Sequence, residues 1–135
     1  MRCALALVGV LLCLGCARQQ AASPESHIDA SVSSRIGLPL YPAAAPAEGG
    51  TVERKSGVGL VSAAYYRSPD SIAKVEAFYA ARLPKGSLKM FINESDGGTA
   101  SFSFASGTAH KEVILSADSG GTIIALSSTA KQARR

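Results

Sequence analysis

His110 and Glu112 are the residues of this sequence whose types and spacing best suit acid–base chemistry. Residues two apart in a strand share a face, so the segment HKEVILSA places both side chains on the same side. A carboxylate beside an imidazole can polarise it for general acid or base catalysis. The alternative is a solvent-facing strand on which both residues meet cross-strand neighbours. We favour this alternative because no third ligand or nucleophile accompanies the pair.

Other polar groups do not complete a site. His27 and Asp29 are two residues apart, but they fall in a segment that we expect to be a mobile tether. Glu94 and Asp96 form an acidic pair in a glycine-rich turn, whereas calcium takes six or more oxygen ligands. No serine lies in a G-x-S-x-G motif, and SGVGL and SDGG lack the strand–loop–helix context of a phosphate-binding loop. The sequence therefore predicts no metal and no cofactor.

The first sixteen residues have the organisation of an export signal. Arg2 supplies a positive charge, residues 4–14 form an uncharged apolar run, and Gly15-Cys16 follows. The run has eleven residues, and about 20 are needed to cross a membrane as a helix. The pattern is typical of a secretory signal peptide over residues 1–15.

The segment CLGC, residues 13–16, resembles the lipobox of bacterial lipoproteins, in which a Gly-Cys pair ends the apolar run. The resemblance implies cleavage before Cys16, diacylglycerol on its sulfur and acylation of the new N-terminus. Several acyl chains, at about 0.8 kcal/mol per buried CH₂, would hold a domain on a membrane. Cys3 and Cys13 would leave with the signal, so the mature chain would have no free thiol. An ordinary cleaved signal and an apolar terminus with accidental cysteines are the alternatives.

Composition divides the remaining chain into three parts. Residues 16–35 are rich in Gln, Ala and Ser, and we expect them to form a flexible tether. Residues 36–130 suffice for one small domain, and residues 131–135 form a basic tail. By analogy with lipoproteins, Ala17 after the anchoring cysteine favours the outer over the inner membrane.

Prolines dominate the start of the domain. The segment IGLPLYPAAAPAEGG, residues 36–50, has three prolines and cannot form a regular helix. We expect an extended strap on the domain, ended by a turn over 48–50. Tyr41 and Pro42 form a candidate interaction surface, although a buried tyrosine more often docks its own chain on the core.

One helix is clear. Ser68 is the expected N-cap, Pro69 the first helical residue, and Pro84 with Gly86 the stop. Apolar residues recur at three- and four-residue steps and predict one buried stripe. They are Ile72, Val75, Phe78, Tyr79 and Leu83.

Strand-like segments flank this helix. Two precede it from Thr51 onward, and about four follow, joined by turns of hairpin length. Leu88, Met90 and Ile92 fall on one face, and TASFSFA directs Phe102 and Phe104 inward. The order is ββαββββ, which predicts an α+β fold: an antiparallel sheet of about five to six strands with one helix on one face.

Two segments together resemble a known type of domain. LPLYPAA, residues 38–44, is similar to the (I/L)P-x-YPGA motif of small, largely uncharacterised bacterial lipoprotein domains. In these domains a D-S-x-x-x-V-x-x-F-Y-x-x-x-L helix follows, and this chain matches its fixed positions. They are Asp70, Ser71, Val75, Phe78, Tyr79 and Leu83. The resemblance implies this fold and an envelope location, and it assigns no catalytic residue.

The chain is mildly basic, with a net charge of +4, and Lys131, Arg134 and Arg135 lie within its last five residues. Anionic lipid headgroups or envelope polymers are the partners that such a tail suits, unless it is merely a solubilising end. Nucleic acid is not expected, because the basic residues are not interleaved with aromatic ones.

These observations favour a membrane-anchored, periplasm-facing lipoprotein domain with a non-catalytic binding or envelope-structural role. Its membrane partner would be lipid joined to Cys16. One alternative is an accessory subunit of an envelope complex that presents the strap or the outer sheet face. A less favoured alternative is an enzyme that uses His110 and Glu112.

Overall fold

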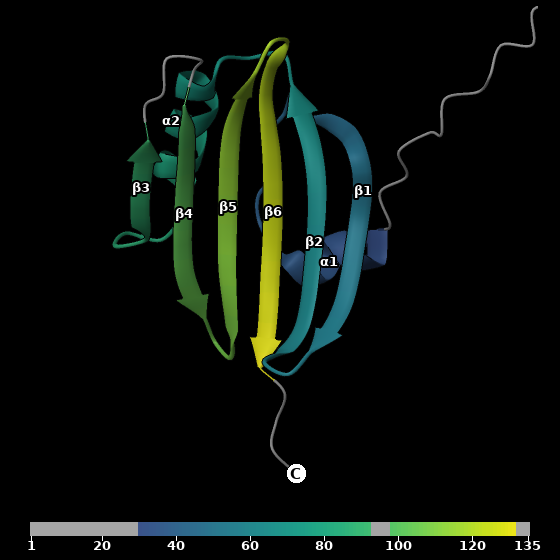
Figure 1. Cartoon of the computed structure of the whole chain (residues 1–135). Helices are drawn as coiled ribbons and strands as arrows, with labels where there is room; N and C mark the ends of the chain where they lie inside the picture. Colours follow the sequence, from purple (N-terminus) through teal and green to yellow (C-terminus); the bar gives the residue numbers. More distant parts are fainter. Residues whose placement is uncertain (1–29, 93–97, 132–135) are drawn as a thin grey trace, which may run out of the picture.

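The structure is a computed structural model that describes residues 30–92 and 98–131 of the chain. Within these residues, six antiparallel strands form one open sheet and two helices pack on the same face of it (Figure 1). The predicted α+β class and the predicted ββαββββ order of elements along the chain are confirmed. The elements are α1 (Ala30–Ile36), β1 (Ala45–Ser56), β2 (Gly59–Ser68), α2 (Ile72–Arg82), β3 (Leu88–Ile92), β4 (Thr99–Ser106), β5 (Ala109–Asp118) and β6 (Gly121–Lys131).

The strands lie in the order β1-β2-β6-β5-β4-β3. Helix α2 carries the chain from β2 across the sheet to β3 at the opposite edge (Figure 1). Three hairpin connections then return the chain until β6 pairs with β2. Strands β2, β6, β5 and β4 are therefore hydrogen-bonded on both sides, and residues far apart in the sequence meet across them.

The hydrophobic core lies between the helices and the sheet. Along β6 and β5, alternate side chains are fully buried on this side, which we call the helix face. Burial of one such aliphatic side chain contributes about 1.5–3 kcal/mol. Large buried side chains on the strands and helices include Tyr66, Phe102, Leu115, Ile124, Leu126, Val75, Tyr79 and Ile36. The opposite side, which we call the open face, carries half-exposed residues such as Tyr65, Ile114 and Ala125.

Helix α1 is the main departure from the sequence prediction, which extended the tether to Arg35. The helix covers Ala30–Ile36 and ends on Ile36, whose side chain is 2% exposed in the core. The hydroxyls of Ser33 and Tyr66 lie 3.4 Å apart, which ties the helix to β2. Residues 30–35 are therefore part of the folded domain and not of a tether, and the rest of the predicted tether, residues 16–29, lies outside the described residues.

The expected turn over 48–50 was also wrong. Strand β1 runs through this segment, and its register with β2 shifts between Pro46 and Thr51. Gly49 and Gly50 take φ values of 99° and 52°, which side chains other than glycine rarely adopt. The two glycines therefore make an irregularity within a continuing strand rather than its end.

The predicted helix starts later than expected. Helix α2 begins at Ile72, with Ser71 in the N-cap position, and Ser68 is the last residue of β2. The Ser68 hydroxyl accepts a hydrogen bond from the Asp70 backbone N–H at 3.1 Å, so it shapes the connection and does not cap the helix. The predicted stripe is confirmed: three of its residues are buried, and two are partly buried against the core. The buried residues are Val75, Tyr79 and Leu83, and the others are Ile72 and Phe78.

The inward and outward faces of the later strands can now be assigned. Phe102 is 3% exposed and Phe104 is partly buried against the core, as their alternation predicted. Met90 and Ile92, on the edge strand β3, are 55% and 48% exposed on the open face. None of the described helices is long and apolar enough to cross a membrane.

Candidate binding site

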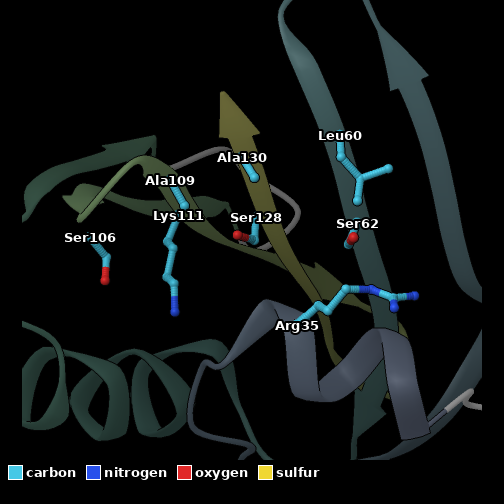
Figure 2. Close-up of a pocket in the computed structure, with 8 residues that line it drawn as sticks. All are labelled: Arg35, Leu60, Ser62, Ser106, Ala109, Lys111, Ser128 and Ala130. Atoms are coloured by element: carbon cyan, nitrogen blue, oxygen red, sulfur yellow. The ribbon is translucent and has the colours of Figure 1, made fainter. Parts of the chain in front are cut away.

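Helices α1 and α2 do not cover the whole helix face. Near the end of the sheet where β2 begins and β6 ends, a pocket of about 320 Å³ opens between α1 and the strands (Figure 2). Its lining combines two cations, three serines and three apolar residues. They are Arg35 and Lys111, then Ser62, Ser106 and Ser128, then Leu60, Ala109 and Ala130.

The strand register explains this lining. Leu60, Ala130 and Ala109 lie opposite one another across β2, β6 and β5 and form an apolar row. The next row on the same face, nearer the core, is Ser62, Ser128 and Lys111. Because alanine and serine are small, the two rows leave a hollow beside α1.

Arg35 is held in place by an acidic residue of β1. Its Nε lies 3.0 Å from Glu53 Oε1, and its second terminal nitrogen donates to Oε2 at 3.1 Å. Ser62 donates a further hydrogen bond to Glu53 Oε1 at 3.2 Å. The pair is half-exposed and stabilises the fold by about 1 kcal/mol at most, but its forked geometry orients the guanidinium. Two of the five guanidinium N–H groups are committed, and three remain.

Lys111 differs because its charge is not neutralised. Its amine donates to the Gly37 carbonyl at 2.9 Å, and no carboxylate among the described residues pairs with it. An ammonium group has three donors, so two remain. In Figure 2 the Lys111 amine and the Arg35 guanidinium lie on opposite sides of the Ser128 hydroxyl, and the guanidinium extends away from Lys111, past Ser62. Since Glu53 offsets Arg35, the wall carries one excess positive charge, which favours a small anion.

Of the strap predicted over residues 36–50, residues 37–44 connect α1 to β1, and the name is kept for them. This strap is attached to the domain at a second polar cluster. The Tyr41 hydroxyl donates to Asp70 Oδ2 at 2.6 Å, and Lys74 donates to Oδ1 at 2.8 Å. The Tyr41 ring is 5% exposed and packs edge-to-face on Phe78 at 5.1 Å. Tyr41 therefore fastens the strap to α2 and presents little surface to a partner, whereas its neighbour Pro42 is exposed.

The same cluster shifts three ionisations. Hydrogen bonds from Lys74 and Tyr41 lower the pKa of Asp70 below its usual range. The hydrogen bond to Asp70, reinforced by burial, raises the pKa of Tyr41, and the bond to Asp70 also raises the pKa of Lys74. A lowered carboxyl pKa gives stability above about pH 4, which is lost as the pH falls through the folded-state pKa. A raised tyrosine or lysine pKa gives stability below about pH 10, which is lost as the pH rises.

We therefore expect the stability difference between the wild type and Tyr41→Phe to be largest between about pH 5 and 9 and to shrink at both extremes. The measurement is urea unfolding followed by circular dichroism across this range. Tyr65→Phe is the matched control, because Tyr65 lies on the open face and donates to no described carboxylate. A difference for Tyr41→Phe that stays constant from pH 2 to 11 would contradict the assigned hydrogen bond.

His110 and Glu112 lie on the other side of the sheet from the pocket. They share the open face of β5, where His110 is exposed and Glu112 half-buried. Their cross-strand neighbours on β4 and β6 are alanine, serine and threonine residues. Neither lines the pocket beside α1. Across residues 30–92 and 98–131, no group of three or more His, Cys, Asp or Glu could hold a metal ion.

The other candidate residues are spread widely. Lys131 is exposed at the end of β6. The other candidates lie outside the described residues: the rest of the basic tail, the anchor cysteine, the His–Asp pair of the tether and the acidic pair of the turn. They are Arg134, Arg135, Cys16, His27, Asp29, Glu94 and Asp96.

The sequence analysis missed both pocket cations. Arg35 lies near the end of α1, in a segment whose composition predicts a flexible tether. Lys111, by contrast, carried a usable signal, because it shares alternation with the buried Val113 and Leu115. A lysine on the core-facing side of a strand is unusual unless it reaches solvent or a ligand.

Comparison of the chain with family models, curated proteins and solved structures found no match. The resemblance to bacterial lipoprotein domains therefore stays a prediction, and the site must be interpreted from its own geometry.

Proposed function

We propose that the chain is a membrane-anchored, non-catalytic binding domain that faces the periplasm and is held by lipid on Cys16. The observation that carries the proposal is the Gly15-Cys16 pair at the end of the apolar run. Thirteen residues, 17–29, separate this cysteine from the first residue of α1. Fully extended, they span about 45 Å at most, so the pocket would stay close to the membrane surface.

A binding role suits the groups that the pocket contains. Arg35 and Lys111 are cationic donors, a chemistry that suits anions, and Ser128 adds a hydroxyl to the same lining. The pair best suited to proton transfer, His110 and Glu112, lies on the opposite face. We therefore prefer binding to catalysis.

Metabolic labelling with palmitate tests the anchor. The wild type should incorporate label and fractionate with membranes, and Cys16→Ser should lose both properties. Cys13→Ser is the matched control, because that residue would leave with the signal peptide and its loss should leave labelling unchanged. Equal labelling and membrane association of Cys16→Ser and the wild type would overturn the anchor.

A second candidate function is that of an accessory subunit in an envelope complex. The open face favours it, because no described helix covers this side and Met90 and Ile92 are exposed at its edge (Figure 1). A stoichiometric partner that co-purifies from solubilised membranes with the wild type, and not with Ile114→Lys, would favour this candidate. The exposed Lys131, with the basic residues after it, is the corresponding candidate contact for an anionic envelope polymer.

A further inference from the structure

We infer that the pocket beside α1 binds a small amphiphile with one negative charge, of which a medium-chain carboxylate is the type. The inference rests on the proposed binding role and names its ligand class, but it does not depend on the lipid anchor. Charge, free hydrogen-bond donors and an apolar row each contribute to it.

The charge of the pocket sets the charge of the ligand. Arg35 is matched by Glu53, whereas Lys111 has only a neutral carbonyl as its partner among the described residues. The pocket thus has one unmatched cation. A group with one negative charge would restore neutrality, and a cationic or neutral amphiphile would not.

The free donors set the chemistry of the head group. Lys111 has two uncommitted N–H groups at one side of the pocket, whereas the Arg35 guanidinium extends away from Lys111, past Ser62, and is bound to Glu53 (Figure 2). The Ser128 hydroxyl lies between the two cations. A carboxylate accepts about four hydrogen bonds through two oxygens, so it suits the Lys111 donors together with the Ser128 hydroxyl.

The apolar row sets the rest of the ligand. Leu60, Ala130 and Ala109 line the outer part of the pocket, where an alkyl segment would leave water. At about 320 Å³, the pocket lies at the small end of the range of about 300–1,000 Å³ for ligand sites. It therefore suits a single short chain rather than a diacyl lipid.

Lys111 also has a structural alternative. Its amine lies so near Gly37 that an added Cβ at that glycine would be 3.0 Å from the nitrogen. The lysine could serve only to fasten the connection between α1 and β1. Removal of its charge would then change stability and leave ligand binding unaffected, so the test must measure both.

The test uses the full chain in phosphatidylcholine nanodiscs and an eight-carbon carboxylate that carries a terminal diazirine. Photolysis should label the peptides that contain Leu60 or Ala130. Lys111→Met should lower this labelling about tenfold, the loss of one charge-assisted hydrogen bond. Lys131→Met is the matched control, since it removes the same charge from the open face at the end of β6 and should label like the wild type. Melting temperatures of all variants are measured in parallel.

Competition identifies the head group. Octanoate should displace the probe, and octylamine and octanol should not. Octyl phosphate carries close to two negative charges at neutral pH, so better competition by octyl phosphate than by octanoate would overturn the assignment of a single charge. Where Lys111→Met melts lower, Lys111→Arg keeps the cation and should retain the labelling. Equal labelling of the Lys111→Met and Lys131→Met variants, or equal competition by octylamine, would overturn the inference. The palmitate result for Cys16 is independent of this outcome, so failure of the anchor and failure of the pocket are distinguishable.

Discussion

Replacement of Gly121 by alanine should lower the free energy of unfolding by about 3 kcal/mol or more, the scale of a strained backbone that also clashes. Gly121 has a φ of 136°, and an added Cβ would lie 2.1 Å from the carbonyl oxygen of Ser68. The neighbouring atoms are backbone atoms of Ser68 and Pro69, which no rotamer change can move. The end of β2 or the start of β6 must therefore shift.

The shift would reach the start of α2 as well. Thr122, fully buried beside Gly121, donates a hydrogen bond from its hydroxyl to the Asp70 carbonyl at 2.8 Å. This bond joins β6 to the segment between β2 and α2. Movement of β6 would break it and leave a buried hydroxyl without a partner, which adds about 1–3 kcal/mol to the cost.

Gly120→Ala is the matched control for this prediction. A Cβ at Gly120 would meet only a side-chain nitrogen of Arg67, at 3.5 Å, which is ordinary contact. We expect its stability within about 0.5 kcal/mol of the wild type. Both variants can be compared by urea unfolding followed by circular dichroism. Similar midpoints for Gly121→Ala and the wild type would show that β2 and β6 are farther apart here than the structure has them.

The fold was predictable where burial follows the repeat of an element. Phe102 and Phe104 alternate with serines, and the stripe from Ile72 to Leu83 recurs at helical spacing. Each of these patterns indicates which side of its own helix or strand faces the core, so it can be interpreted without knowing which elements pack against it. Antiparallel order then followed from the short connections.

Helix α1 and the β1 irregularity were not predictable in this way. The helix has seven residues, and among its described side chains Ile36, at the last position, lies in the core cluster. A helix this short is not stable alone and depends on contacts with β1 and β2. Gly49 and Gly50 are typical of a turn, but β1 continues to pair with β2 beyond them, so the strand does not end at the two glycines.

The candidate site was still less accessible to sequence reasoning. Arg35 and Lys111 are far apart in the chain, and they line one pocket only because β6 inserts between β2 and β5. His110 and Glu112 do share a strand face, as alternation predicted, but Val113 and Leu115 are only a weak sign that the other face is covered, because Ile114 on this face is apolar too. That assignment needs the whole topology.

The second large effect on stability is expected at Leu115 of β5, and its neighbour Ile114 provides the comparison. Leu115 is fully buried on the helix face, between Ile124 of β6 and Ala100 of β4. Leu115→Ala should cost about 3 kcal/mol, since it removes three buried carbons and leaves a cavity that the strands cannot close. Ile114 lies on the open face and is half-exposed. Ile114→Ala should cost about 1 kcal/mol, because the lost group was partly in water already.

The comparison also tests whether the open face is free in the purified chain. If a second copy covered it, Ile114 would be buried in that assembly, and the two substitutions would destabilise to a similar extent. The unfolding midpoint of the wild type would then rise with protein concentration, because association stabilises the folded state by mass action. A small cost for Ile114→Ala and a midpoint independent of concentration are the results expected of a domain whose open face is uncovered. That face would then be available to the partner required by the accessory-subunit candidate, independently of the pocket on the helix face.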